Sequence, residues 1–213
     1  MAFLGNAKIG TKLIVTVGIL IVAAVGAISV IIGINVSRQA RADAEKISRQ
    51  TAFHYAEGAR GELNEAMNAA RSLADVFGTI ATEAAVDVSR EEGNRILADL
   101  IENNPHFLGV YVGFEPNAFD GRDAEYRGAP GHDGTGRYVP YLTLDGEGEA
   151  VLEPLLDYDI AGAGDYYQLP KQRKRETVLD PFLYTVQGED VLLTSLVVPI
   201  IDGEGTFLGI AGV

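Results

Sequence analysis

A long run without charged side chains, residues 13–34, limits what this chain can fold into more than any other feature. The run reads LIVTVGILIVAAVGAISVIIGI. At 1.5 Å per residue, a helix over it is about 33 Å long, which matches the hydrocarbon layer of a membrane. A cleaved signal peptide is the alternative, but its apolar core usually has only about 7–15 residues. We therefore expect an uncleaved transmembrane helix over residues 13–34.

The charges around this run bear on its orientation. Two lysines precede it, and four basic residues follow it, namely Arg38, Arg41, Lys46 and Arg49. A count of positive charges alone would not place the N-terminus inside. The N-terminus is short, however, and large domains that follow a first span are exported largely regardless of charge. We expect a cytoplasmic N-terminus over residues 1–12 and an exported domain after the span.

Composition excludes several classes of function. The chain has a formal net charge of −13 and no cysteine. An acidic domain disfavours nucleic acid and anionic membrane surfaces as partners. Without cysteine, neither a disulfide scaffold nor a thiolate metal site can form.

Residues 35–86 have the pattern of one long amphipathic stalk helix. No proline interrupts them, and Leu63, Ala70, Phe77 and Ala84 recur every seven residues. Such a seam is typical of a helix that pairs with a second copy, and also of one that packs on its own domain. We expect both, with the early half forming a homodimer and the later half packing.

From residue 87 onward the pattern is that of an α+β domain. Ser89 followed by Glu91 and Glu92 predicts the start of a helix, which Asn103-Asn104-Pro105 ends. Strand patterns follow over 106–116 and on both sides of a turn at 145–146. A short helix beginning at Tyr166 and capped by Asp165 leads to three more strands, over 177–188, 189–203 and 205–213. This order predicts an antiparallel sheet with flanking helices.

A polar, glycine-rich loop is expected over residues 117–136. A loop of this length is usually functional or mobile. Its Asp120, Asp123, His132 and Asp133 are hard metal ligands, but their spacing is not that of a calcium loop. We expect no metal site.

Residues 157–188 concentrate aromatic and acidic side chains. The rings are Tyr158, Tyr166, Tyr167, Phe182 and Tyr184, and the acids are Asp157, Asp159, Asp165 and Asp180. Aromatic rings beside carboxylates suit a small cation, through cation–π attraction and direct charge. The alternative is that these are half-buried aromatics and solvated loop acids.

The order of motifs along the chain resembles the ectodomain of bacterial methyl-accepting chemotaxis receptors. After the span and the long helix come FEPNAFDG, GRYVPY, DYYQLPK, DPFLYTVQG, LTSLVVPI and FLGIAGV. Together they resemble the membrane-distal, PAS-like module of a double Cache domain, here over residues 87–213. The resemblance implies a sensor in the bacterial inner membrane, with a periplasmic domain that encloses a small molecule. It also implies a proximal module and a cytoplasmic part that contacts a chemotaxis kinase and adaptor, so we expect the chain to be truncated within a strand.

The same resemblance implies positions for ligand contacts. Members that bind amino acids resemble R-x-W-Y on the short helix, with an aspartate on the next strand. Tyr166 and Tyr167 stand at the W-Y positions, whereas Gly164 replaces the arginine and Tyr184 replaces the aspartate. A glycine cannot form an arginine–carboxylate fork. We therefore expect a pocket for a cationic amine or quaternary amine, with an organic acid as the alternative.

The candidate ligand-binding residues combine aromatic, acidic and basic side chains. Asp159 or Asp165 is expected to face the cation. Arg137 would be the alternative anion-binding residue, unless it forms a surface ion pair with an acid such as Asp133. The full set is Arg137, Tyr138, Tyr141, Asp159, Asp165, Tyr166, Tyr167, Phe182 and Tyr184.

Catalytic patterns are missing from the sequence. Ser195 lies in LTSLV rather than in G-x-S-x-G, which indicates a buried strand hydroxyl. No phosphate loop or dinucleotide fingerprint occurs. We expect neither an enzyme nor a cofactor. The remaining alternatives are the same ectodomain on a sensor histidine kinase or cyclic-dinucleotide enzyme, and a membrane-anchored adhesion module whose pocket is filled by its own side chains.

Overall fold

The computed structural model describes residues 8–83 and 85–213, and the chain divides into two compact units, Met1–Ala59 and Arg60–Val213. Helix α1, Ile9–Thr82, contributes residues to both units and continues without a break at residue 34. Its apolar part reaches a mean hydropathy of 2.8 over 18 residues, so by length and composition α1 can cross a membrane. Residues 1–7 of the expected N-terminus and Ala84 of the expected seam lie outside the described residues.

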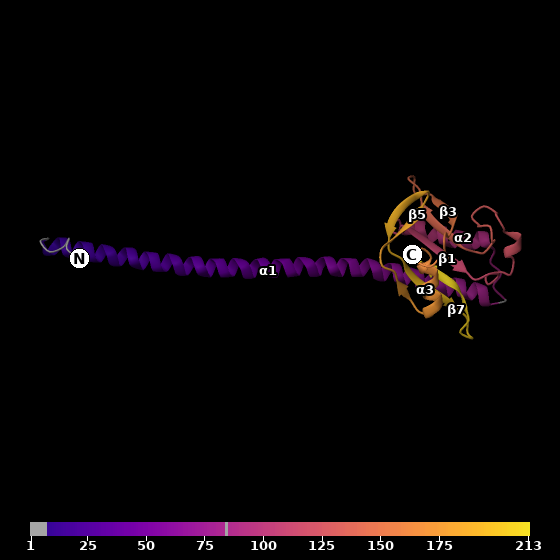
Figure 1. Ribbon diagram of the computed structural model, residues 1–213, viewed down its shortest axis with the longest axis horizontal. Coiled ribbons are helices and arrows are strands. Elements are labelled where there is room, and N and C mark those ends of the chain that lie inside the picture. The colour runs from indigo at the N-terminus through magenta and orange to yellow at the C-terminus, as the bar shows by residue number, and fades with distance from the viewer. Residues whose placement is uncertain (1–7, 84) are drawn as a thin grey trace. The chain divides into compact units, whose positions relative to one another are not determined.

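The second unit, in which Figure 1 labels β1, β3 and β7, is built on a six-stranded antiparallel sheet in the order β3-β2-β1-β8-β7-β4. Its strands are β1 Gly109–Phe114, β2 Pro140–Leu144, β3 Ala150–Pro154, β4 Thr177–Val178, β7 Leu196–Ile201 and β8 Phe207–Gly212. A separate hairpin pairs β5 Phe182–Val186 with β6 Glu189–Leu193. The other helices are α2 Arg90–Asn103, α3 Asp165–Arg173 and the short 3₁₀ helix η1 Asp123–Glu125. The predicted α+β class is confirmed.

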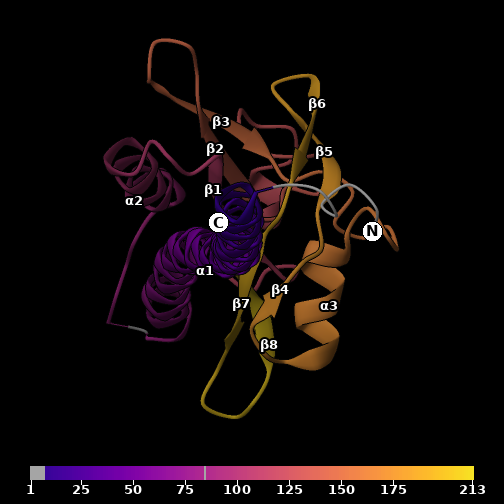
Figure 2. The same cartoon turned by 90° about the vertical axis from the view of Figure 1, so that its left-hand side faces the viewer.

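Strand β1 is buried along its whole length, and its side chains alternate between two hydrophobic cores. Val110, Val112 and Phe114 belong to the core that also contains residues of α1 and α2. Tyr111 belongs to the second core, which contains residues of α3. Figure 2 shows α2 and α3 on opposite sides of the sheet. The sheet is therefore a central layer with one core on each face.

The later half of the predicted helical seam packs on the sensor unit itself. The buried residues of α1 are Ala66, Met67, Ala70, Leu73, Ala74 and Phe77. Leu63, by contrast, is 43 % exposed. The seam from residue 66 onward is thus an intramolecular contact.

The two helix starts follow different local rules. α2 begins after Ser89, as predicted, and Ser89 caps it in a capping box with Glu92. Gly164, not Asp165, is the N-cap of α3, and Asp165 is its first residue. The Asp165 carboxylate instead accepts a hydrogen bond from the backbone N–H of Gly162 at 3.0 Å. The predicted capping role of Asp165 is therefore wrong.

The last part of the chain contains five strands where three were predicted. Pro181 separates β4 from β5, because proline cannot donate a ladder hydrogen bond. Residues 194–195 separate β6 from β7, so Ser195 is buried at a strand junction rather than inside a strand. The turns at Gln187-Gly188 and at 202–205 lie at the boundaries between the three predicted strands.

The polar loop over residues 117–136 is held by a buried arginine. Arg90, which is 1 % exposed, donates three hydrogen bonds of 2.7–2.8 Å to Asp120 and Asp123. A fourth, of 2.7 Å, goes to the carbonyl of Gly136. Burial opposes ionisation of Asp120, but the hydrogen bonds from Arg90 and from the N–H of Arg122, together with the charges of both arginines, lower the pKa of Asp120. Two of the four potential metal ligands therefore bind Arg90.

Replacing Arg90 by methionine should destabilise the fold strongly. We expect a loss of about 3–5 kcal/mol in the free energy of unfolding, because Asp123 would be left buried without its partner. Urea denaturation of the full chain in detergent micelles, followed by circular dichroism, measures this loss. Arg122→Met is the matched control, since Arg122 lies on the same loop in an exposed pair with Glu125 and should lose far less. Equal losses in the two variants would contradict the role of Arg90.

Candidate functional site

Five aromatic side chains from four elements meet in the second core. Tyr111 of β1, Tyr141 of β2, Tyr166 of α3, and Phe182 and Tyr184 of β5 are called here the aromatic box. Tyr184 lies edge-on to Tyr141 and Tyr166, with ring centroids 5.6 and 5.7 Å apart. Tyr111 is edge-on to Tyr166 at 5.8 Å, and Phe182 stacks on Tyr166 at 6.4 Å. These are the offset and edge-to-face geometries that aromatic pairs prefer.

Glycines on the sheet make room for the floor of the box. Tyr111 pairs with Gly212 of β8, and a Cβ at Gly212 would lie 2.2 Å from Cζ of Tyr111. In the same way, a Cβ at Gly109 would lie 2.4 Å from a ring carbon of Tyr141. Both rings can therefore lie across the strands, because their neighbours have no side chain.

The β5–β6 hairpin forms one wall of the box. Side chains alternate along β5, so Phe182 and Tyr184 pack into the second core while Leu183 between them is 68 % exposed. Gln187 at the hairpin turn fastens the tip to the main sheet. Its amide nitrogen donates to the hydroxyl of Thr143 at 2.9 Å and to the carbonyl of Leu144 at 3.1 Å.

The hydroxyl groups of the box hold the loop that follows β3. Tyr166 donates to the carbonyl of Leu156, and the N–H of Leu156 donates to the Tyr184 oxygen at 2.9 Å. Tyr111 shares a 2.6 Å hydrogen bond with Ser195. Within residues 8–83 and 85–213, the hydroxyl of Tyr141 has no hydrogen-bond partner.

Burial sets the protonation state of the box. It raises the pKa of Tyr111, Tyr141 and Tyr166 above the ordinary value for tyrosine. These side chains are therefore neutral phenols at physiological pH. The box thus offers aromatic faces and edges together with uncharged hydroxyl groups, and it contains no basic side chain.

A second, charged group of residues surrounds Tyr167, the residue of α3 that follows Tyr166. Arg137 donates to the carbonyl of Phe114 at 2.9 Å and to the hydroxyl of Tyr167 at 2.8 Å. Tyr167 and Lys171 both donate to one oxygen of Glu115, at 2.5 and 2.7 Å. Burial alone would raise the pKa of Glu115, but these hydrogen bonds outweigh it and lower that pKa. This charged cluster fastens α3 to the end of β1.

The charged cluster changes the interpretation of Arg137. Its third nitrogen lies 3.5 Å from Asp159, so each of its three nitrogens already has a partner in the protein. Arg137 thus pairs with a nearby acid, as in the alternative expectation, but the acid is Asp159 rather than Asp133, whose carboxylate accepts hydrogen bonds from Thr135 and Tyr158. An anion that bound Arg137 would have to displace one of these partners.

The structure thus separates the predicted ligand residues. Tyr141, Tyr166, Phe182 and Tyr184 lie in the aromatic box, whereas Arg137, Tyr167 and Asp159 lie in the charged cluster. Asp165 is bonded to Gly162 within its own loop. Tyr138, also in the predicted set, faces the opposite core, with its ring centroid 4.3 Å from that of Phe119, so it does not lie with Tyr141 in the box.

The sequence reasoning missed Tyr111. Its signal was available, because it is the one hydroxyl-bearing ring in an otherwise apolar strand, with Gly109 and Gly113 two positions away on either side. Alternation along a strand places those glycines on the same face as Tyr111. That face can therefore accept large side chains from neighbouring elements around one polar ring, and the ring of Tyr141 fills the space over Gly109.

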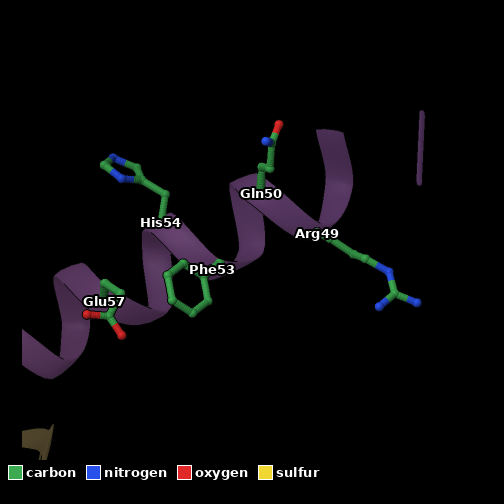
Figure 3. Close-up of a pocket in the computed structure, with 5 residues that line it drawn as sticks. All are labelled: Arg49, Gln50, Phe53, His54 and Glu57. Carbon is green, nitrogen blue, oxygen red and sulfur yellow. The ribbon is translucent and has the colours of Figure 1, made fainter. Parts of the chain in front are cut away.

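A shallow hollow also occurs in the first unit. It is lined by Arg49, Gln50, Phe53, His54 and Glu57, all from α1 (Figure 3). Since every lining residue comes from about two turns of one exposed helix, this is a surface groove rather than an enclosed cavity. We do not assign a ligand to it.

Substituting Gly212 should disturb the floor of the box directly. We expect Gly212→Ala to push the Tyr111 ring away and to cost about 1–3 kcal/mol of unfolding free energy through overpacking. Urea denaturation of the full chain measures the loss. Gly203→Ala, at an exposed turn with open space around the new methyl group, should change little and serves as the control. A Gly212→Ala variant as stable as the wild type would contradict this geometry.

The chain is similar in sequence to a curated methyl-accepting chemotaxis protein. The chain is 30 % identical to the methyl-accepting chemotaxis protein TlpQ of Pseudomonas aeruginosa over 134 residues, which cover 58 % of this chain and 19 % of that protein. The chain thus spans about a fifth of the length of this curated relative.

Solved structures show the same fold. An extracellular domain assigned to the histidine kinase mmHK1S-Z3 is 43 % identical, with a TM-score of 0.61, and the match covers 71 % of this chain and 51 % of that one. A structure of methyl-accepting chemotaxis protein X is 23 % identical with a TM-score of 0.62, covers 76 % of this chain and 58 % of that one, and supports the fold alone.

The family assignment rests on the region that forms the sheet and the aromatic box. A family profile described as methyl-accepting chemotaxis protein-like, first PDC sensor domain, matches residues 94–213. This range begins within α2 and contains every strand described above. The chain therefore belongs to the family of methyl-accepting chemotaxis protein-like first PDC sensor domains, and its second unit is the sensor.

Proposed function

We propose that this protein is a transmembrane chemoreceptor whose periplasmic domain binds a small cationic molecule in the aromatic box. An amine or quaternary amine is the favoured class of ligand. The observation that carries the proposal is the meeting of five rings from β1, β2, α3 and β5 at one place. Converging aromatic side chains with a few polar groups are typical of small-molecule sites.

The charges around the box favour a cation over an organic acid. Ring faces attract cations, and Arg137, the residue expected as the alternative for binding an anion, already has partners in the protein. A side chain could not stand at Gly164 either, because a Cβ there would lie 2.3 Å from the carbonyl oxygen of Asp157. The arginine that binds an amino-acid carboxylate in related domains therefore has no room in this backbone.

Access to the box requires movement of the hairpin. The five rings contact one another directly, so a ligand must separate them. β5 and β6 pair only with each other, not with the main sheet. The hairpin is therefore the wall that can move at the lowest cost in backbone hydrogen bonds.

Strand β1 gives a short route from the box to the stalk helix. Tyr111 contributes to the box, while its neighbours Val110 and Val112 pack in the core that contains Phe77 of α1. A ligand that binds one arrangement of β1 more tightly would shift the packing of α1 by that difference in affinity. Residues 35–86 would carry the change to the membrane as a homodimer, in which exposed side chains such as Phe53 find partners. A cytoplasmic part would pass it to a chemotaxis kinase and adaptor.

A second candidate function keeps the sensor and changes the output. The 43 % identity to an extracellular domain assigned to a histidine kinase favours this alternative. The coding sequence downstream of Val213 distinguishes the two, since a methyl-accepting coiled coil and a kinase domain have different patterns. A cyclic-dinucleotide enzyme would be recognised in the same way. An adhesion module without a ligand remains the third alternative. It requires a pocket filled by the protein's own side chains, and the direct contacts among the five rings meet that requirement.

Calorimetric titration of the full chain in detergent micelles tests the proposal. The panel comprises phenethylamine, choline, glycine and succinate, and we expect binding of at least one of the two cations. Tyr184→Ala should weaken that binding by about tenfold or more, since it removes a half-buried ring that faces the ligand.

The matched control for this substitution is Leu183→Ala. Leu183 is the next residue on the same strand, but its side chain is exposed on the outer face of the hairpin. The affinity of the Leu183→Ala variant for the cation should stay within about twofold of the wild type. Absence of binding across the whole panel would favour the adhesion module.

A further inference from the structure

We propose that Asp157 is the carboxylate that meets the positive charge of the ligand, so that it selects cations over their neutral analogues. This inference rests on the proposed function and names the residue that would determine specificity at the same site. It differs from the expectation that Asp159 or Asp165 faces the cation. Neither of those residues reaches the aromatic box, for the reasons given above.

The backbone places Asp157 at the edge of the box. Two box tyrosines hold the peptide groups of the preceding residue, Leu156. Tyr166 donates a hydrogen bond to the carbonyl of Leu156, which belongs to the peptide bond with Asp157. The N–H of Leu156 donates a hydrogen bond of 2.9 Å to the oxygen of Tyr184. Asp157 is therefore one residue away from two hydroxyl groups of the box.

The conformation of Asp157 is unusual and is held from the far side. Its φ angle is +55°, in the left-handed region that residues with a Cβ rarely adopt. The Asp157 carbonyl accepts a 2.8 Å hydrogen bond from the N–H of Ile160, and the backbone of Gly164 packs closely against it. The turn thus keeps Asp157 at a defined place on the rim of the box.

The carboxylate of Asp157 is uncommitted, in contrast to its acidic neighbours. Asp159 pairs with Arg137, Asp165 accepts from Gly162, and Glu153 accepts from the N–H of Gln187 at 3.2 Å. Asp157 is exposed, and its carboxylate has no hydrogen bond or ion pair within the part of the chain that the structure describes. A cation could bind it without first breaking a contact inside the protein.

The negative charge of Asp157 already acts on the box. Burial is the main cause that raises the pKa of Tyr166 and of Tyr184, and the charge of Asp157 adds to it in both. The same field would stabilise a positive charge between those rings. A charged hydrogen bond is stronger than a neutral one, so an ammonium group should benefit more than a hydroxyl group in its place.

Matched pairs of probes test this inference on the full chain in detergent micelles. Phenethylamine is compared with 2-phenylethanol, and choline with 3,3-dimethylbutan-1-ol, because each pair has nearly the same shape and differs by one positive charge. For at least one cation that binds the wild type, we expect Asp157→Asn to weaken binding by about tenfold or more in calorimetric titration. Binding of the neutral partner should change by less than about twofold.

Asp180→Asn is the control for the change in net charge. Asp180 is an exposed acid that precedes Pro181, outside the box, and its removal should leave cation binding within about twofold of the wild type. Circular dichroism of each variant checks that the fold is retained.

Two kinds of result would overturn the inference. One is a cation that binds Asp157→Asn as tightly as the wild type, or that loses no more affinity than its neutral partner, and this result leaves the proposed function intact. The other is a wild type that binds neutral or anionic probes in a manner that depends on Tyr184, but binds neither cation, and this result keeps the aromatic box as a small-molecule site while it overturns the cationic class of ligand. If no probe of any class binds the wild type, the proposed function fails together with the inference.

Discussion

The burial of β1 on both faces is the constraint on which the rest of the sensor depends. An exposed face would tolerate many side chains, but a strand with two covered faces needs apolar or satisfied residues at every position. Valines and Phe114 fill one face beneath α1 and α2. Tyr111, flanked by glycines, occupies the other face beneath α3. One strand therefore joins the stalk helix to the candidate site through alternate residues.

Two buried arginines each hold another segment of the sensor unit in place. Arg90 binds the loop over 117–136, and Arg137 binds α3 and the segment around Asp159. Burying a guanidinium is unfavourable unless its donors find acceptors, and both side chains meet this condition with carboxylate, carbonyl or phenol oxygens. The positive charges of these two arginines are thus engaged in contacts that hold the fold together. The aromatic box is left without a basic side chain, which is the physical basis for favouring a cation.

The likeness to both chemoreceptors and a domain assigned to a histidine kinase fits the architecture of the chain. The sensor unit contains its own two cores, and its output would pass through α1. A fold of this kind can serve different outputs, because function depends on the site and on the attached domains rather than on the sheet. The chemistry of the box can therefore be studied independently of the output.

The sequence by itself determined the features that depend on local order. The uncharged run, the capping box at Ser89, the turns and the α+β class follow from residue patterns a few positions long. It also indicated that aromatic residues between 158 and 184 matter. A helix turns by about 100° per residue, so Tyr166 and Tyr167 point in different directions. Local patterns could not show which neighbours each of them meets.

Only the tertiary structure decided which side chains meet. Tyr138 and Tyr141 are three positions apart, so alternation places them on opposite faces of the sheet, and only one reaches the box. The acids differ for another reason. Asp159 pairs with Arg137 and Asp165 accepts a hydrogen bond within its loop, whereas the carboxylate of Asp157 has no partner in the described part of the chain. These roles depend on how the chain folds, and the spacing of the acids in the sequence does not encode them.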